Sequence, residues 1–147
     1  MVDYLEFQVS KFMFKVATDR LYSDEGMWVK TGDRLVEVGI TDYLQQRSGD
    51  VAFAEVKPTG TVVNMGDELV VIETIKVNIS LSSPVSGKVV EVNSSMETAP
   101  EVINQDPYGA GWLVKIELAG GDDGLKNLLS PQEYFEKTRQ EAEQEVK

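Results

Sequence analysis

The sequence predicts an all-β domain with minor helices, folded as a β-sandwich or flattened barrel with a C-terminal helix. Two observations predict this class. Many short apolar runs alternate with polar residues at a period of two, and Gly, Pro, Asn and Asp separate these runs. The few helical patterns lie at the edges of the strand pattern. With 147 residues, the chain fits one domain with a sizeable core.

We expect three parts along the chain. Residues 1–15 form an N-terminal extension, residues 16–129 form the β domain, and residues 130–147 form a helix that packs on it and frays at its end. At the end of the extension, Phe12, Phe14 and the following Val16 alternate with Met13 and Lys15, which predicts a strand or an extended edge segment.

Strands are predicted wherever β-branched or aromatic residues alternate between turn signals. The predicted ranges are 27–30, 35–39, 51–56, 61–63, 69–72, 77–81, 89–92 and 112–118. Within 51–56, Val51, Phe53 and Val56 cannot all face one side of a regular strand. A bulge or a strand end is therefore expected near Glu55.

Helices are predicted at 41–47, 100–104, 125–129 and 131–145. The first has Thr41 as a candidate N-cap, and Gly49 follows it as a residue that can adopt positive φ. The last begins with a capping box, in which Ser130 precedes Pro131 and Glu133 follows three residues after the cap. From Lys137 onward the sequence is nearly all polar, so we expect this end to pack little.

Composition excludes several classes of function. The chain has 25 acidic and 14 basic residues, and a net charge of −11 disfavours binding to nucleic acid. It has no cysteine and no histidine, which excludes disulfides, zinc–thiolate sites, cysteine nucleophiles and Ser-His-Asp triads. No apolar run is long enough to span a membrane, and no secretory signal is visible. We therefore expect a cytoplasmic monomer that is not an enzyme.

The most informative stretch, residues 70–87, is centred on Lys76. An apolar run precedes this lysine and an alternating run follows it, so Lys76 is predicted at the exposed tip of a β-hairpin. The pattern Gly-x-Val-Val occurs on both sides of it, at residues 60–63 and 87–90. This echo favours two similar β-layers joined by the hairpin, although such Gly-Val pairs are also common in β proteins.

The motif Glu73-Thr-Ile-Lys76, followed by Ser83-Pro-Val-Ser-Gly87-Lys-Val-Val-Glu-Val-Asn93, resembles the lipoyl-bearing region of the glycine cleavage system H protein family. The resemblance covers roughly residues 16–136. Its other motifs are Gly39-Ile-Thr-Asp-Tyr43, Gly49-Asp-Val51, Asn104-Gln-Asp-Pro-Tyr-Gly109, the run at residues 110–116, and Leu129-Ser-Pro-Gln-Glu-Tyr134. Several long motifs in the right order make the resemblance specific.

The resemblance implies a hammerhead-like lipoyl β-sandwich and a lipoyl group in amide linkage to Lys76. Glu73, three residues before the lysine, is then a candidate for recognition by the enzyme that attaches lipoate. The implied partners are a lipoate ligase or lipoyl synthase system, together with oxidoreductase or transferase enzymes that act on the arm. The protein itself would be a carrier whose swinging arm moves covalently bound intermediates between them.

Two segments depart from the family. Its members commonly have Asp-His-Glu-Trp where this chain has Glu25-Gly-Met-Trp28, and small residues followed by Ser-Asp where this chain has Val77-Asn-Ile-Ser80. These departures favour a relative that carries sulfur intermediates for a heterodisulfide-reductase-like sulfur-oxidation system. The alternative is a glycine cleavage H protein, which carries an aminomethyl group between glycine decarboxylase, aminomethyltransferase and dihydrolipoamide dehydrogenase.

Three other interpretations are weaker. Biotin carriers use the same hairpin but usually place methionines beside the lysine, where this chain has Ile75 and Val77. A binding protein that kept the fold without the arm would not need Lys76. An autonomous enzyme would need catalytic groups that a chain without histidine or cysteine does not supply.

Overall fold

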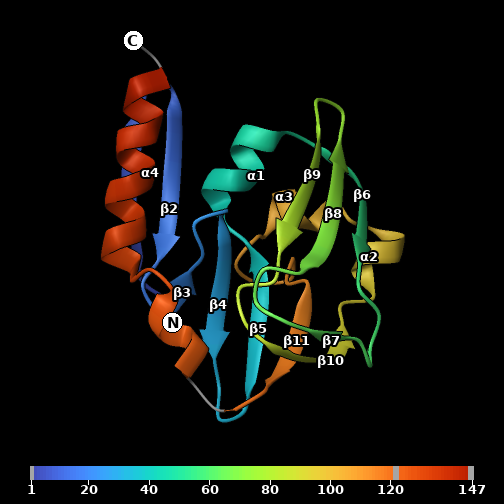
Figure 1. Ribbon diagram of the computed structural model, residues 1–147. Helices are drawn as coiled ribbons and strands as arrows, with labels where there is room; N and C mark the ends of the chain where they lie inside the picture. Colours follow the sequence, from blue (N-terminus) through green and yellow to red (C-terminus); the bar gives the residue numbers. More distant parts are fainter. Residues whose placement is uncertain (1, 121–122, 146–147) are drawn as a thin grey trace.

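The computed structural model describes residues 2–120 and 123–145, which form three β-sheets and a few helices (Figure 1). The strands are β1 (Tyr4–Val9), β2 (Phe12–Ala17), β3 (Leu21–Tyr22), β4 (Met27–Thr31), β5 (Leu35–Ile40), β6 (Val51–Val56), β7 (Val62–Val63), β8 (Glu68–Thr74), β9 (Asn78–Ser82), β10 (Gly87–Val92) and β11 (Val114–Leu118). The helices are α1 (Asp42–Ser48), α2 (Ser95–Thr98), α3 (Val102–Gln105), a 3-10 helix η1 (Asp123–Asn127) and α4 (Pro131–Glu145).

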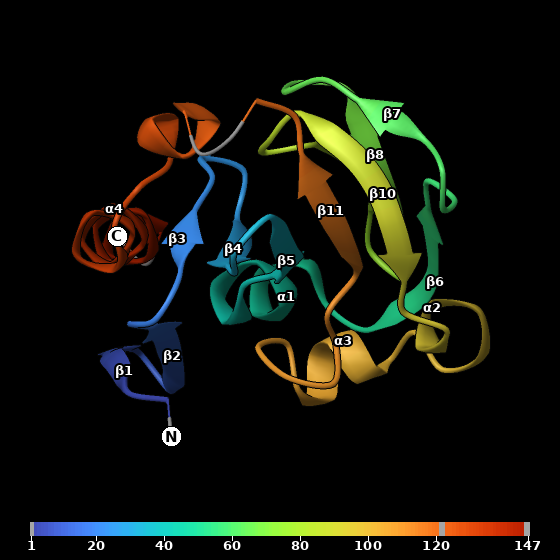
Figure 2. The same cartoon turned by 90° about the horizontal axis from the view of Figure 1, so that it is seen from below.

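Two of the sheets enclose the main core. The larger has the order β3-β4-β5-β11-β10-β7 and the smaller the order β6-β8-β9 (Figure 2). Buried side chains from both sheets, such as Val38, Ile116, Ile72 and Leu81, belong to one apolar cluster. The predicted all-β class with a C-terminal helix is confirmed. The sheets form a flattened sandwich and do not close into a barrel.

The echoing Gly-x-Val-Val segments lie next to each other. β7 and β10 pair antiparallel, with Gly87 opposite Val63. Gly60 N donates to Val89 O at 2.7 Å, and Val89 N donates to Thr61 O at 2.9 Å. The two segments are therefore hydrogen-bonded neighbours, and they lie at the side of the sandwich away from the tip of the β8–β9 hairpin (Figure 1).

The N-terminal hairpin forms a separate small sheet. β1 and β2 pair in register from Tyr4 opposite Ala17 to Val9 opposite Phe12, around a turn in which Ser10 has a φ of 58°. Alternate side chains on one face, Phe7, Val9 and Phe14, pack with Tyr43 of α1 and Ala142 of α4 in a second apolar cluster. The hairpin thereby holds α4 against the β domain.

The predicted helix termini are confirmed at both well-marked helices. Thr41 Oγ1 accepts a hydrogen bond from Leu44 N, and Gly49 ends α1 with a φ of 91°. At α4, Glu133 N donates to Ser130 Oγ at 3.1 Å, and Ser130 N donates to Glu133 Oε1 at 2.9 Å. This reciprocal pair is the capping box that the sequence predicted.

Of the two alternatives predicted near Glu55, the strand end is confirmed, because β6 ends at Val56. The bulge in β6 lies elsewhere, between Val51 and Phe53, where the register against β8 shifts. Two other local predictions need correction. The last strand begins at Val114, two residues later than predicted. Thr138 and Ala142 are buried, so α4 packs well past Lys137. The predicted frayed end of this helix includes residues 146–147, which lie outside the described residues.

Among the described residues, no helix is long and apolar enough to cross a membrane.

Candidate functional site

Lys76 lies at the tip of the hairpin formed by β8 and β9. Glu73 pairs with Asn78, so the chain reverses over residues 75–77. Lys76 is the central residue of this three-residue loop, and its side chain is exposed. Figure 1 shows the tip projecting beyond the end of the sandwich. The structure thus places Lys76 where the sequence predicted it.

Thr74, the last residue of β8, fixes the shape of this loop. Its Oγ1 accepts hydrogen bonds from Lys76 N at 3.2 Å and from Val77 N at 3.0 Å. The same hydroxyl donates to Val77 O at 3.0 Å, and Thr74 N donates to that oxygen at 2.9 Å. Sequence reasoning missed this role. The signal that could have indicated this role is a threonine directly before the loop, because Ser and Thr hydroxyls stabilise such turns.

Two apolar side chains flank the lysine in the open. Ile75 is 80% exposed and Val77 is 49% exposed. Exposed apolar side chains on a projecting loop cost solvation free energy in the isolated molecule, and they are typical of surfaces that contact another protein. The tip is therefore suited to insertion into a partner.

The stem of Lys76 lies along the end of α1. A Cβ built on Gly49 would be 3.6 Å from both Cδ and Cε of Lys76, which is ordinary contact distance. A side chain at this position would still leave room for the lysine stem, so the requirement for glycine comes from its φ of 91°. The lysine is directed from its hairpin across α1, toward the side of the molecule that carries β2 and α4.

Glu73 faces another surface. It pairs with Phe53 of β6 and lines an open hollow of about 800 Å³ beside α2. Phe53 is 66% exposed, and Glu55, Glu97 and Glu101 lie around the same hollow. The structure thus does not bring Glu73 into the loop with Lys76. It leaves Glu73 accessible on an acidic surface near the tip, where recognition by an attaching enzyme stays a prediction.

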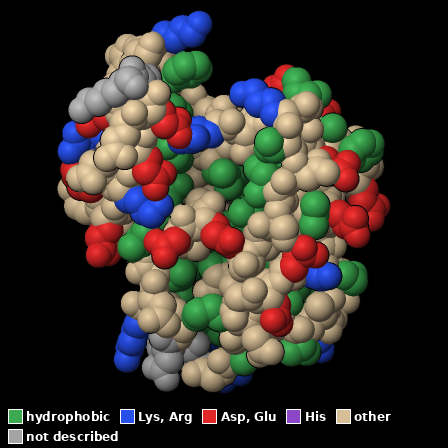
Figure 3. Space-filling view, turned by 45° about the horizontal axis from the view of Figure 1, so that its top comes forward, with side chains coloured by type: hydrophobic (Ala, Val, Ile, Leu, Met, Phe, Trp, Pro, Cys, Tyr) green, Lys and Arg blue, Asp and Glu red, His purple; other side chains and the backbone are tan. Residues whose placement is uncertain are grey.

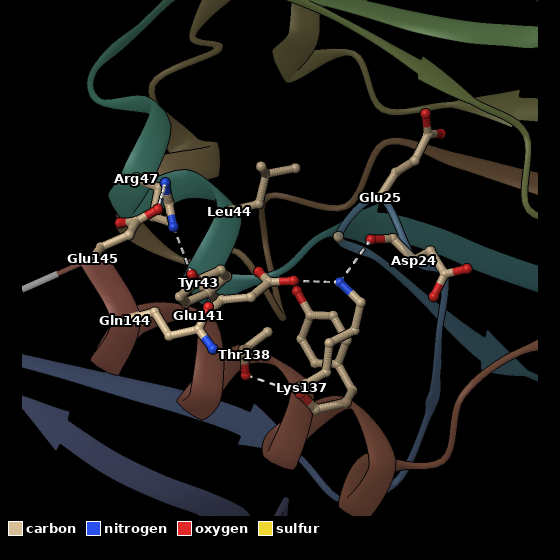
Figure 4. Close-up of a pocket in the computed structure, with 12 residues that line it drawn as sticks. Asp24, Glu25, Tyr43, Leu44, Arg47, Lys137, Thr138, Glu141, Gln144 and Glu145 are labelled. Carbon is tan, nitrogen blue, oxygen red and sulfur yellow. Dashed lines mark hydrogen bonds and ion pairs between the residues drawn. The ribbon is translucent and has the colours of Figure 1, made fainter.

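A polar cleft of about 480 Å³ lies between α1, α4 and the loop after β3 (Figure 4). Lys137 spans it, because its Nζ donates to Glu141 Oε1 at 2.7 Å and to Asp24 O at 3.5 Å. Glu25 joins this loop to the hairpin strand, since its Oε1 accepts from Ser82 N at 2.8 Å. The segment in which the sequence departs from the resembled family therefore lines this cleft.

Arg47 stands at the edge of the cleft and links α1 to α4. It forms an ion pair with Glu145, and its guanidinium donates to Tyr43 Oη at 2.6 Å (Figure 4). Burial raises the pKa of Tyr43 above its ordinary value, and the hydrogen bond from Arg47 opposes this shift in part. Tyr43 therefore stays a neutral phenol at physiological pH.

The chemistry of the site is that of a presented amine. The described residues contain no group of three or more His, Cys, Asp or Glu that could hold a metal ion. The whole chain lacks the histidine and cysteine side chains from which most acid–base and nucleophilic sites are built. What the tip offers is one exposed primary amine on a fixed loop, which is a suitable point for covalent attachment.

Comparisons with known proteins identify the family of the chain. The family model "Glycine cleavage H-protein" matches residues 20–141. The chain is 40% identical over 131 residues to the glycine cleavage system H protein of Carboxydothermus hydrogenoformans, which covers 89% of this chain and 100% of that protein. It is 44% identical over 121 residues to the corresponding protein of Coprothermobacter proteolyticus, covering 82% of this chain and 94% of that one.

A solved structure has the same fold. The crystal structure of a glycine cleavage system H protein from Mycobacterium marinum superposes with a TM-score of 0.75 at 31% sequence identity. The superposition covers 83% of this chain and 98% of that one. The likeness therefore covers most of both chains.

Proposed function

Because the chain belongs to the glycine cleavage H-protein family, whose members are carriers with a lipoyl group on a lysine, we propose that Lys76 is the attachment residue. One observation supports this most directly. Lys76 is the central, exposed residue of a three-residue tip that Thr74 holds in one conformation. An acyl group in amide linkage to its Nζ would lie outside the sandwich, in reach of a partner enzyme.

The residues around Lys76 fit this group. Lys76 is exposed, so its amine is accessible for acylation. When bound, the group supplies a strained five-membered disulfide ring that a nucleophile can open. The chain holds and presents that ring, and partner enzymes do the chemistry. Since the chain has no cysteine, no thiol of its own competes for the disulfide.

We further propose that the cargo is an aminomethyl group. The relatives are named as glycine cleavage system H proteins, and they support this alternative better than the sulfur cargo that residues 25–28 and 77–80 favoured. The partners would then be glycine decarboxylase, aminomethyltransferase and dihydrolipoamide dehydrogenase. The sequence departures lie at the polar cleft and just after the lysine, where they can adjust contacts without changing the carrier role.

Intact-mass spectrometry tests the attachment site. In a host that makes lipoyl proteins, the wild-type chain should gain the mass of one lipoyl group, and Lys76→Arg should not. Lys11→Arg is the matched control, because Lys11 lies in the turn of the other exposed hairpin, between β1 and β2. A wild-type chain without the mass increment, or an increment that persists in Lys76→Arg, would contradict the proposal.

A second measurement tests the cargo. The lipoylated protein is incubated with glycine decarboxylase and isotopically labelled glycine, and its mass is followed. An aminomethyl increment that appears only with both enzyme and glycine supports glycine cleavage. Absence of that increment, together with sulfur-atom increments when a sulfane sulfur donor and sulfur-oxidising partners are supplied, would restore the sulfur interpretation.

A further inference from the structure

The N-terminal hairpin ends close to Lys76. Its turn lies at Ser10 and Lys11, and the start of β2 is at the same end of the molecule as the tip of the β8–β9 hairpin (Figure 1). Phe12 and Lys76 line the same hollow of about 240 Å³. Figure 3, which brings this end forward, shows hydrophobic side chains in the hollow between the two halves of this face. We call residues 9–13 the hairpin end.

The hairpin end is no part of the span that the family model matches, which is residues 20–141. Both strands of the hairpin, β1 and β2, lie before that span, whereas Lys76 lies within it. A contact made by the hairpin end would therefore be one that the matched span does not provide.

The hairpin is fixed beside α1 by hydrogen bonds. Lys15 N donates to Asp42 Oδ2 at 3.0 Å, and Lys15 O accepts from Tyr108 Oη at 2.8 Å. Gln46 Nε2 donates to Met13 O at 2.9 Å. A surface that is already ordered binds a partner at a lower entropy cost than a segment that must first be ordered.

Apolar side chains are exposed on both sides of Lys76. Val9 and Phe12 are directly opposite in the β1–β2 ladder, so their side chains lie on the same face. Val9 is buried, but Phe12 is 49% exposed. On the other side, Ile75 and Val77 of the tip are exposed as well. Exposed apolar side chains that gather around one site are typical of a surface that contacts another protein.

The rim of this hollow offers apolar contact more than charge. Among the residues that line it, the charged ones besides Lys76 are Arg47 and Glu145. These two form an ion pair with each other, so their charges offset. Apart from the amine itself, the rim therefore fits a partner whose contact region is apolar.

The chemistry of attachment indicates which enzyme this partner is. To form the amide, Lys76 Nζ attacks the carbonyl carbon of an activated acyl donor. The C–N bond forms, the bond to the leaving group breaks with its electron pair, and a proton passes from the amine to solvent. The enzymes that use the finished arm react instead with its dithiolane, at the far end from Nζ. Only the acylating enzyme must therefore approach the residues around Nζ.

We propose that the hairpin end is a docking surface for the enzyme that acylates Lys76, with Phe12 as its main contact. This inference rests on the function proposed above. The partner is an acyltransferase that holds an activated eight-carbon chain, so the entrance to its acyl site has an apolar rim. Phe12 and the exposed side chains of the tip would contact that rim on either side of the amine. The hairpin adds affinity without touching the reacting atoms.

Steady-state acylation of the unmodified protein tests the proposal. The full chain is made without lipoate and is then incubated with lipoate, ATP and the purified lipoate ligase of the organism that encodes it. Intact mass gives initial rates at several protein concentrations. Phe12→Ser should raise KM for the protein about fivefold and leave kcat nearly unchanged, because the lost contact is made equally in the ground state and the transition state.

Matched variants separate this contact from general effects. Met13→Ser changes a neighbouring residue that is 44% exposed on the opposite face of β2, and it should keep the wild-type KM. Phe12→Leu keeps an apolar side chain and should stay close to wild type. Lipoylated Phe12→Ser, prepared by prolonged acylation, should be reduced by dihydrolipoamide dehydrogenase and NADH at the wild-type rate. Circular dichroism shows that each variant is folded before rates are compared.

Three outcomes would overturn the inference, and they are distinct from failure of the proposed function. The first is a wild-type KM in Phe12→Ser, and the second is an equal rise of KM in Met13→Ser. The third is an equal loss in the reaction with dihydrolipoamide dehydrogenase, because the variant would then affect every partner. In each case the wild-type chain still gains a lipoyl group that is absent from Lys76→Arg. If the wild-type chain gains none, the carrier function fails and the docking surface fails with it.

Discussion

At the residue scale, Thr74 shows how one hydroxyl can organise an exposed loop. Its three hydrogen bonds join the end of β8 to the two residues that follow Ile75. Lys76 itself was predictable from its motif and from the strands on either side. The role of Thr74 was not predictable, because threonine has a high β-propensity and is also common in the interior of a strand.

Replacing Thr74 with valine should loosen the tip without unfolding the sandwich. The change keeps the shape of the side chain but removes the hydroxyl, so we expect a loss of about 1 kcal/mol in the free energy of unfolding. Amide hydrogen exchange at Lys76 and Val77 should become faster. Thr61→Val is the control, since Thr61 Oγ1 donates to Pro58 O in a different turn. If both variants change exchange at the tip equally, Thr74 has no special role.

A second residue-scale prediction concerns Asp19. The hydrogen bond from Arg20 lowers the pKa of this carboxyl, although partial burial opposes the shift. A lowered pKa favours the folded state while the carboxylate is ionised, so this contribution is present above about pH 4 and is lost as the pH falls further. Asp19→Asn should therefore lose less stability than wild type on acidification. Urea unfolding between neutral and strongly acidic pH measures this, and parallel curves would contradict it.

At the element scale, helix ends were predictable and strand irregularities were not. The helix ends depend on local hydrogen bonds and backbone conformation, which residue type alone predicts. The residues concerned are Thr41, Gly49 and Ser130. The bulge in β6 depends on its register against β8, so the alternation of residues 51–56 could not locate it. The burial of Ala142 depends on the N-terminal hairpin. The helical pattern of α4 does not indicate that this hairpin packs against it.

Gly87 gives a prediction for one strand pair. A Cβ at this position would overlap the carbonyl oxygen of Glu117 and lie 2.7 Å from Ile116 Cγ2. Gly87→Ala should therefore separate β10 from β11 and cost about 2 kcal/mol or more. Gly124→Ala is the control, because its new Cβ would meet only Met65 Cε at 3.5 Å. Equal unfolding midpoints for the two variants in urea would show that β10 can shift without cost.

At the scale of the whole molecule, the fold class and the position of Lys76 were predictable because both rest on patterns among residues that are close in sequence. The packing of the N-terminal hairpin was not predictable, since it brings together β1, β2, α1 and α4. The alternation of Phe12 and Phe14 predicted a strand but did not indicate what its apolar face would cover. Surfaces built from distant segments need the tertiary arrangement before they can be recognised.

The pH dependence of stability should also be a property of the whole chain. It contains no histidine, the side chain that ordinarily titrates near neutral pH. Burial raises the pKa of Tyr22, Tyr108 and Tyr134 far above the ordinary value. Unfolded tyrosines ionise near pH 10 while these three stay neutral, so their contribution is full below about pH 10 and lost as the pH rises.

We therefore expect alkaline unfolding to coincide with the ionisation of these tyrosines. Tyrosinate absorbance and circular dichroism, recorded on one sample during an alkaline titration, should show a shared transition. Tyr134→Phe should delay it to higher pH, although it also removes the 2.8 Å contact between Tyr134 Oη and Thr41 Oγ1. Full ionisation of the tyrosines before any loss of circular dichroism would contradict the prediction.

The short loop that carries Lys76 has a consequence for how many enzymes can bind one molecule of the protein at a time. With the arm on Lys76, as proposed, the three-residue tip has room for one enzyme at a time, so partner enzymes would bind each carrier molecule in turn. One enzyme would have to dissociate from the tip before the next could bind to it. The rate of the overall reaction would then depend on the ratio of carrier molecules to partner enzymes. An excess of one inactive partner enzyme would inhibit the others by competing for the same tip.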